Sequence, residues 1–535
     1  MPHHRTPSSR VAASVAAPFS GARQASLREA NLRLVLRTIY EAATPPSRAD
    51  VAAVTGMTRS TVSRLVDDLV KGSFVAELDP PAMSGPGRPA TPLVPCAGSI
   101  AALGLQINAG FLAAVVVDLT GRVLAQRKER GDFVGSDPAQ VLPQLGDLGR
   151  EVLAQIGPDI RTAGVGLALP GIVASDTGRL LRAPNLGWSE VAVAELLGPL
   201  SARGLGQSPT ATVVTATVVT GTAVTATAAT GAAVTAAPVT GTAVPGRPDA
   251  PPGPRGSVDD LGAAEPDDAD TDGDTSHGPT DTGADSPVDR ADAAADPRHR
   301  LSVRIHNEAD YAAWAVAHLG PGRAGELRDF VYLTGEIGIG GAVVVDGHVM
   351  TGRHGWAGEL GHVCVNPGGP TCRCGSTGCL EQYVGGVALR ARAGAGRQAT
   401  DETADDATDE TADDAATDPR QTTIDASIRL VARARAGDED ARAVLDEATR
   451  AIGIALGGVV NVLDIPTIVL GGHLAVLGAE IGDDLADLLA SRVLSARWAP
   501  PRIVLAHDEV EEAGALGAAM RELDHVLTDP ARWLP

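Results

Sequence analysis

Residues 359–381 read Glu-Leu-Gly-His-Val-Cys-Val-Asn-Pro-Gly-Gly-Pro-Thr-Cys-Arg-Cys-Gly-Ser-Thr-Gly-Cys-Leu-Glu. Three of the five cysteines of the chain, Cys372, Cys374 and Cys379, follow His362 closely in this segment. Three thiolates and one imidazole make a tetrahedral zinc set, and the intervening glycines allow the tight turns that close it. The alternative is three buried free cysteines on a glycine-rich loop. The crowded Cys-x-Cys-x4-Cys spacing beside a histidine favours zinc.

Two glutamates, Glu359 and Glu381, bracket the candidate metal ligands. Glu-x-Gly-His followed by Cys-x-Cys-Gly-x-x-Gly-Cys-x-Glu resembles the signature of the ROK family (repressors, open reading frames and sugar kinases). The resemblance implies a structural zinc ion with four protein ligands: His362, Cys372, Cys374 and Cys379. It also implies sugar contacts from Glu359, His362 and Glu381, with His362 serving both sites through its two ring nitrogens.

The two remaining cysteines match no ligand position. We expect Cys364 to be a buried, small apolar side chain, and Cys96 has no partner in the sequence. So few cysteines beside a thiolate metal site predict a reducing compartment without disulfides.

The length of 535 residues allows three or so domains, and the net charge of −22 is unevenly distributed. Most of the excess negative charge lies in two acidic tracts, residues 259–296 and 401–418. Such low-complexity runs are typical of solvated, disordered inserts. The remaining chain is close to neutral, so the overall acidity does not exclude a nucleic-acid partner.

Residues 205–250 repeat Thr, Val, Ala and Gly without aromatic side chains. This composition is too poor in bulky residues for a solenoid core, so we expect a mobile insertion. Weak β structure or aggregation stays open, because Val and Thr favour extended backbone. No apolar stretch has the length of about 18 residues that a membrane span needs. Residues 1–23 predict a disordered leader rather than a signal peptide.

Residues 24–95 predict three helices and a wing. The apolar positions of the first and third helices recur at helical spacing: Leu32, Val35, Leu36 and Ile39, then Val62, Leu65, Val66 and Leu69. Ser47 with Asp50 predicts a capping box at the start of the second helix. Gly56 supplies the turn, and Thr58 caps the third helix.

The polar face of the third helix carries Arg59, Ser60, Ser63 and Arg64, the residue types that read a major groove. Arg88 lies in a Gly-Arg-Pro sequence of the predicted wing, where it can enter a minor groove. A plain three-helix bundle with a solvated polar face is the alternative. The segment 47–66 is similar to the winged helix-turn-helix of ROK repressors, which implies binding to operator DNA.

The rest of the chain has strand signals at residues 101–124, 163–169 and 301–305, with helical stretches between them. This pattern indicates an α/β fold with a central mixed sheet. The resemblance implies a two-lobed, actin-like ATPase fold with a ligand cleft between the lobes. The expected boundaries are a first lobe at 96–204, an insert at 205–300, a continuation at 301–394, an acidic insert at 395–420, and a C-terminal part at 421–535.

Family kinases use two glycine-rich phosphate loops and a catalytic base. In place of Asp-x-Gly-Gly-Thr, this chain has Gln106, Asn108, Ala109 and Gly110. In place of Gly-Thr-Gly-Ile-Gly-Gly-Gly it has residues 336–342, which begin with a carboxylate, Glu336. The kinase Asn-Asp pair appears as Asn307-Glu308, which displaces the base by about one methylene. We therefore expect kinase activity to be lost and no residue to be catalytic.

The sugar-side positions of the family are retained by comparison, namely Asn185, Asn307, Glu308, Glu359, His362 and Glu381. Individually, Asn185 could cap a turn and Glu308 could pair with an arginine. Together, these donors and acceptors suit a polyhydroxylated ligand.

The sequence thus predicts a cytoplasmic, sugar-responsive repressor of carbohydrate genes that binds operator DNA as a homodimer or homotetramer. Its effector would be a sugar or a sugar phosphate. Two alternatives stay open: an active sugar kinase with an attached DNA-binding domain, and a constitutive DNA-binding protein with a vestigial cleft.

Overall fold

A computed structural model describes residues 20–79, 90–174, 177–200, 301–398, 419–506 and 512–534. The chain divides into two units, and every described residue belongs to the first. The expected leader as far as residue 19, the wing residue Arg88, the insert up to residue 300 and the tract 401–418 lie outside the described residues.

The N-terminal domain contains three helices and a two-stranded hairpin: α1 (Ser20–Tyr40), α2 (Arg48–Thr55), α3 (Arg59–Lys71), β1 (Val75–Glu77) and β2 (Leu93–Pro95). The capping box of Ser47 and Asp50 is present, so that prediction is confirmed. Gly56 ends α2 with a φ of 70°, a left-handed conformation that glycine adopts without strain. The Thr58 side chain accepts the N–H of Thr61 and thereby caps α3.

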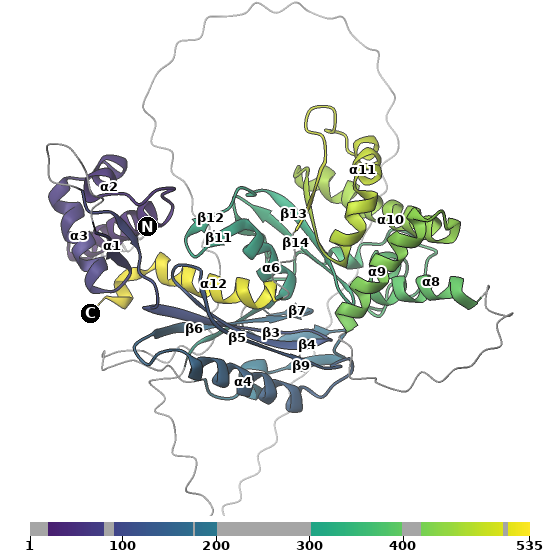
Figure 1. Ribbon diagram of the computed structural model, residues 1–535, viewed down its shortest axis with the longest axis horizontal. Helices are drawn as coiled ribbons and strands as arrows, with labels where there is room; N and C mark the ends of the chain where they lie inside the picture. The colour runs from purple at the N-terminus through teal and green to yellow at the C-terminus, as the bar shows by residue number, and fades with distance from the viewer. Residues whose placement is uncertain are drawn as a thin grey trace, which may run out of the picture. The chain divides into compact units, whose positions relative to one another are not determined.

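The first lobe is built on a mixed five-stranded sheet. Its strand order is β10 (Val303–Asn307), β6 (Arg161–Leu169), β3 (Ile100–Ile107), β4 (Phe111–Asp118) and β5 (Val123–Arg130). The first three strands run parallel, and β3, β4 and β5 are antiparallel neighbours. Figure 1 shows α4 (Pro138–Gln155) on one face of this sheet and α12 (Ala513–Thr528) on the other.

The alternation of side chains along β3 explains this layering. Leu103, Leu105 and Ile107 point into the core that α4 covers. The intervening small residues, Ala102 and Gly104, let α12 approach closely. A Cβ built on Gly104 would lie 1.8 Å from the carbonyl oxygen of Ala515, so the helix backbone rests directly on the strand.

The second lobe contains another mixed five-stranded sheet, so the expected mixed sheet occurs once in each lobe. Its order is β15 (His348–Val349), β14 (Ile339–Val345), β13 (Phe330–Gly335), β16 (Thr467–Gly472) and β17 (Arg502–Leu505). One face packs on α9 (Pro419–Arg435), α10 (Glu439–Leu463) and α11 (His473–Arg492). The other face packs on α6 (Glu308–Ala317), which also packs on α12 and so connects the two lobes.

Smaller elements complete the described part of the chain. They are α5 (Val193–Leu196), α7 (Glu381–Val384), α8 (Gly386–Gln398), the 3-10 turns η2 (Leu360–His362) and η3 (Pro530–Trp533), and the short strands β7 (Ile172–Val173), β8 (Leu180–Ala183), β9 (Trp188–Val191), β11 (His318–Gly320) and β12 (Arg323–Ala324). Both α8 and α9 reach into residues 395–420, which were expected to form an acidic insert. Within the described ranges, no helix combines the length and apolar character needed to cross a membrane.

The N-terminal domain shares a hydrophobic core with the first lobe. Ile39 and Phe74 lie in the same buried cluster as Phe111 of β4 and Leu523 of α12. The Arg161 guanidinium reinforces this contact by donating to the carbonyl oxygens of Trp533 and Gly72. The helix α3 is therefore connected to the first sheet through packed side chains. A movement of the first lobe can reach α3 through these contacts.

Substitution of Gly104 tests the close contact between β3 and α12. We expect Gly104→Ala to lower the unfolding free energy by roughly 1–3 kcal/mol, because the methyl group overlaps backbone atoms that have little room to move. Gly458→Ala is the matched control, since nothing lies within 4 Å of a Cβ at that position on α10. The control should be neutral or stabilising by up to about 1 kcal/mol. Equal denaturation midpoints for the two variants would contradict the contact.

Candidate metal centre and ligand cleft

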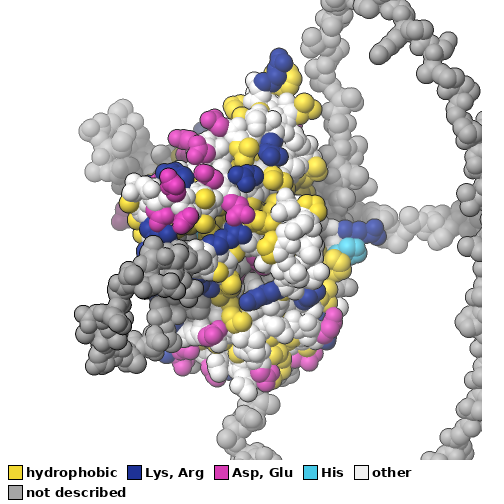
Figure 2. All heavy atoms as spheres, turned by 90° about the vertical axis from the view of Figure 1, so that its right-hand side faces the viewer, with side chains coloured by type: hydrophobic (Ala, Val, Ile, Leu, Met, Phe, Trp, Pro, Cys, Tyr) yellow, Lys and Arg dark blue, Asp and Glu magenta, His cyan; other side chains and the backbone are white. Residues whose placement is uncertain are grey.

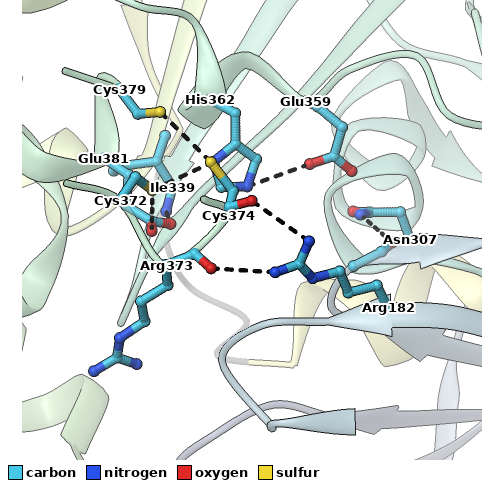
Figure 3. Close-up of polar contacts among 11 residues, drawn as sticks. Arg182, Asn307, Ile339, Glu359, His362, Cys372, Arg373, Cys374, Cys379 and Glu381 are labelled. Carbon is cyan, nitrogen blue, oxygen red and sulfur yellow. Dashed lines mark hydrogen bonds and ion pairs between the residues drawn. The ribbon is translucent and has the colours of Figure 1, made fainter. Parts of the chain in front are cut away.

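Four side chains of the segment 359–381 converge on one point. The donor atoms of His362, Cys372, Cys374 and Cys379 all lie within 4.8 Å of one another. Cys372 Sγ is 3.8 Å from His362 Nδ1, and Cys374 Sγ is 3.7 Å from Cys379 Sγ (Figure 3). A tetrahedral ion with metal–sulfur bonds of about 2.3 Å would separate its sulfur ligands by about 3.8 Å. The donor set therefore fits a four-coordinate metal ion.

Two glycines and short backbone hydrogen bonds give the loop this shape. Gly375 has a φ of 97°, in the left-handed region. A Cβ on Gly378 would lie 1.6 Å from the carbonyl oxygen of Asn366, so no larger residue fits there. The N–H of Cys372 donates to Ser376 O at 2.8 Å and closes the turn that carries Cys374.

His362 has different neighbours at its two ring nitrogens. Nδ1 faces the sulfur atoms, and Nε2 lies 3.8 Å from Glu359 Oε2. Burial raises the pKa of Glu359, the nearby His362 opposes this, and the Glu381 carboxylate raises it further. Glu381 is held on the other side of the cluster, where its Oε2 accepts the N–H of Ile339 at 3.1 Å (Figure 3).

Cys364 is exposed, so the expectation of a buried side chain is wrong. Its neighbours Val363 and Val365 are partly buried against the core of the second lobe. The chain is extended here and pairs with the strand-like segment at Cys379, so alternate side chains point to opposite faces. The sequence pattern could not tell which face would be covered.

The first lobe contributes the remaining predicted sugar residues. Asn185 follows β8, Asn307 ends β10, and Glu308 begins α6. The Asn307 side chain accepts the N–H of Ala309 at 2.8 Å and donates to Gly171 O at 3.0 Å. Asn307 therefore caps α6 and also binds the loop at Gly171 through a hydrogen bond. In Figure 3 the carboxylate of Glu359 lies between His362 and Asn307.

Gly338 brings residues of the two lobes together. A Cβ at this position would lie 2.4 Å from Glu381 Oε2 and 2.6 Å from Asn185 Nδ2. The side chains of Asn185 and Glu381 thus approach the same backbone atom from different lobes. The structure brings together the predicted residues Asn185, Asn307, Glu359, His362 and Glu381, with Glu308 next to Asn307.

Two residues near the cleft were not predicted from the sequence. Asp310 on the first turn of α6 is fully buried, and burial raises its pKa to about 7, against the effect of Arg521 and with a further increase from Glu359. Arg182 of β8 donates to the backbone carbonyls of Arg373 and Cys374, at 3.3 and 3.4 Å, and so connects the first lobe to the loop of the candidate metal ligands (Figure 3). Neither residue belongs to a motif that spacing could reveal.

The polar groups at the expected counterpart of the first phosphate loop, Gln106 to Gly110, form hydrogen bonds within the protein. Gln106 is 3% exposed, and its Oε1 accepts the N–H of Ala515 at the start of α12 at 3.0 Å. Asn108 Oδ1 accepts the N–H groups of Gly110 and Phe111, at 2.8 and 3.1 Å. Asn108 itself donates its backbone N–H to Phe111 O. These groups are therefore engaged within the protein rather than directed at a ligand.

The predicted DNA-reading face lies on α3. Arg59, Ser60 and Arg64 are exposed, and Ser63 is half-buried. Arg48 of α2 supports this helix by donating to Ser63 O and by pairing with Asp67 of α3 and Glu77 of β1. Figure 2 shows the side of the molecule that carries α8 and α10, not the side of α3, and there basic, acidic and hydrophobic side chains are interspersed.

Comparisons with known proteins agree with this organisation. Residues 291–523 match the ROK family model, and residues 34–79 match the IclR helix-turn-helix domain. The xylose repressor of Caldicellulosiruptor bescii is 21% identical over 474 residues, which cover 88% of this chain and 90% of that protein. The glucokinase of Thermotoga maritima is 31% identical over 217 residues, but these cover 41% of this chain and 64% of the kinase.

The fold is also found in a solved structure. The crystal structure of a ROK family transcriptional regulator, a homolog of the E. coli MLC protein, superposes with a TM-score of 0.58. The superposition covers 94% of this chain and 98% of the regulator, with 19% sequence identity. The two proteins therefore share a fold. The protein therefore carries a ROK family domain over residues 291–523, preceded by an IclR-type helix-turn-helix domain over residues 34–79.

Proposed function

We propose that this protein is a sugar-responsive transcriptional repressor, which binds operator DNA through α3 and a sugar through the cleft beside the metal cluster. One observation carries the proposal: a single chain combines an exposed helix-turn-helix face with a group of polar side chains, Glu359, His362 and Glu381, that lie beside the candidate metal ligands. Carboxylates and an imidazole accept and donate hydrogen bonds to sugar hydroxyls. The similarity to a xylose repressor over most of the chain supports the same function.

We propose that the metal is zinc, with a structural role. Three thiolates and one imidazole leave no open coordination position, which is typical of structural zinc sites. When bound, the ion supplies the bonds that close the loop. The protein then uses His362 Nε2 to orient Glu359, and the loop ends at Glu381, so the closed loop sets the spacing of the two carboxylates.

Kinase activity is proposed to be lost. Gln106 places a neutral amide at the start of α12, and the N–H groups around Asn108 are already engaged. The carboxylate of Glu336 lies next to Asn108 and would repel a phosphate. The glucokinase match covers a ROK domain that kinases share, so an active kinase is the second candidate function.

A repressor of this kind is expected to be oligomeric and cytoplasmic. Helix-turn-helix domains bind paired half-sites, so we propose a homodimer or homotetramer. An operator-binding protein acts in the compartment that contains the DNA, and unpaired cysteines at a thiolate metal site suit the reducing conditions of the cytoplasm. The shared core of α1, β4 and α12 gives a physical route by which the cleft could reorient α3.

Binding to upstream DNA with and without a panel of sugars and sugar phosphates tests the proposed function. Salt must be held constant, because phosphate contacts make DNA affinity steeply salt-dependent. We expect one compound to change the DNA affinity by at least about fivefold, the lower range for allosteric coupling. DNA binding that no compound alters would favour a vestigial cleft. ATP-dependent phosphorylation of a hexose that Glu308→Ala abolishes would establish a kinase instead.

Two arginine substitutions test the DNA-reading face. We expect Arg59→Ala and Arg64→Ala each to weaken operator binding by about 1–3 kcal/mol, the usual value for a base-reading arginine. Arg450→Ala is the control, because Arg450 is an exposed arginine on α10, outside the helix-turn-helix domain. Fluorescence anisotropy at fixed salt measures all three. Operator affinities that match the control would place the DNA contact elsewhere.

Cysteine substitutions test the metal site. We expect elemental analysis to find zinc in the wild-type protein and none in Cys374→Ser, and we expect this variant to bind sugar at least tenfold more weakly. Cys364→Ser is the matched control, because this exposed cysteine lies in the same segment but outside the cluster. It should keep both the zinc and the sugar affinity. A Cys374→Ser protein that binds sugar normally would contradict the role of the metal.

A further inference from the structure

One side-chain hydrogen bond joins the turns of the two sheets. Asn108 Nδ2 donates to Glu336 Oε2 at 2.5 Å, although 228 residues separate the two in sequence. Asn108 follows β3 in the first sheet, and Glu336 follows β13 in the second. This contact therefore connects the lobes at the turns β3–β4 and β13–β14.

The donor and the acceptor of this bond are fixed by their surroundings. Asn108 is 5% exposed, and its Oδ1 already accepts the N–H groups of Gly110 and Phe111. Its amide group must therefore point away from its own turn and toward Glu336. A hydrogen bond to a carboxylate is stronger than one between neutral groups.

The turn that carries Glu336 also supports the cleft. The N–H of Glu336 donates to Gly338 O at 3.0 Å, which closes the turn. The next residue, Ile339, donates its N–H to Glu381 Oε2. Gly338 lies against both Glu381 and Asn185 and leaves no room for a side chain. A displacement of this turn would therefore move the hydrogen-bond partner of Glu381 and the surface that Asn185 contacts.

We propose that Asn108 and Glu336 form a latch between the lobes and act as positioning residues for Glu381 and Asn185. Neither residue needs to touch the ligand. The chain connects by its own side chains the two turns that correspond to the phosphate loops of the family's kinases, so the cleft is ordered without a nucleotide. The hydrogen bond between the turns does not depend on the proposed function. Only the measurement of sugar affinity below rests on the proposed sugar site.

Substitutions of the donor Asn108 and of the acceptor Glu336 test the latch. Asn108→Asp keeps an oxygen for the N–H groups of Gly110 and Phe111 but places a carboxylate against Glu336. We expect this variant to increase amide hydrogen exchange in peptides covering residues 336–341 at least tenfold and to weaken sugar binding at least tenfold. Glu336→Gln keeps an acceptor for Asn108 and should change both values by less than about threefold, as expected for a neutral hydrogen bond.

The double variant Asn108→Asp/Glu336→Gln reverses the direction of the hydrogen bond, because glutamine donates to aspartate. It should restore both values to within about threefold of wild type, which is the non-additivity expected of a direct contact. Asn461→Asp is the control: the Asn461 side chain donates to Arg492 O and accepts the N–H of Leu494, so it contacts the backbone outside both turns. It should leave exchange at residues 336–341 unchanged.

Two results would overturn the latch. One is wild-type exchange at residues 336–341 in Asn108→Asp. The other is a double variant that exchanges as fast as Asn108→Asp alone. Hydrogen exchange needs no ligand, so it tests the latch even if the wild-type protein binds no sugar in the panel. A lack of sugar binding would count against the proposed function and not against the latch.

Discussion

Closure of the loop between His362 and Cys379 around four donor atoms is the constraint on which the cleft depends. The donors lie within 4.8 Å of one another, and three of them are thiol sulfurs that would repel each other as thiolates unless a cation lay between them. The same loop begins next to Glu359 and ends next to Glu381. The contacts that close the loop therefore also fix the positions of Glu359 and Glu381, the two carboxylates that we assign to sugar binding.

The cleft is connected to the DNA-binding domain through a short series of packed elements. The second sheet packs on α6, α6 packs on α12, and α12 rests on β3 with no side chain between their backbones at Gly104. Residues of α12 share a buried cluster with Ile39 of α1 and Phe74 next to β1. Cores packed in this way move as units rather than deform continuously, so a change in lobe closure can be transmitted to α3.

The features that depend on local spacing could be predicted from the sequence. The candidate metal ligands lie within one loop and converge on one point, and the caps Ser47 and Thr58 precede the helices that they stabilise. The features that depend on distant pairing could not. The contact between Asn108 and Glu336 spans 228 residues, and the burial that raises the pKa of Asp310 comes from elements far apart in the chain. The exposure of Cys364 depends on which face of an extended segment the second lobe covers.

The central claim is that sugar and operator DNA act on one equilibrium of one protein. Thermodynamic linkage then requires that DNA change the sugar affinity by the same factor by which the sugar changes the DNA affinity. Calorimetric titration of the effector sugar into the protein, free and saturated with operator DNA at one salt concentration, measures this factor directly. Equal reciprocal factors are the expected result. A sugar affinity that is identical in the free and DNA-bound protein would contradict the claim.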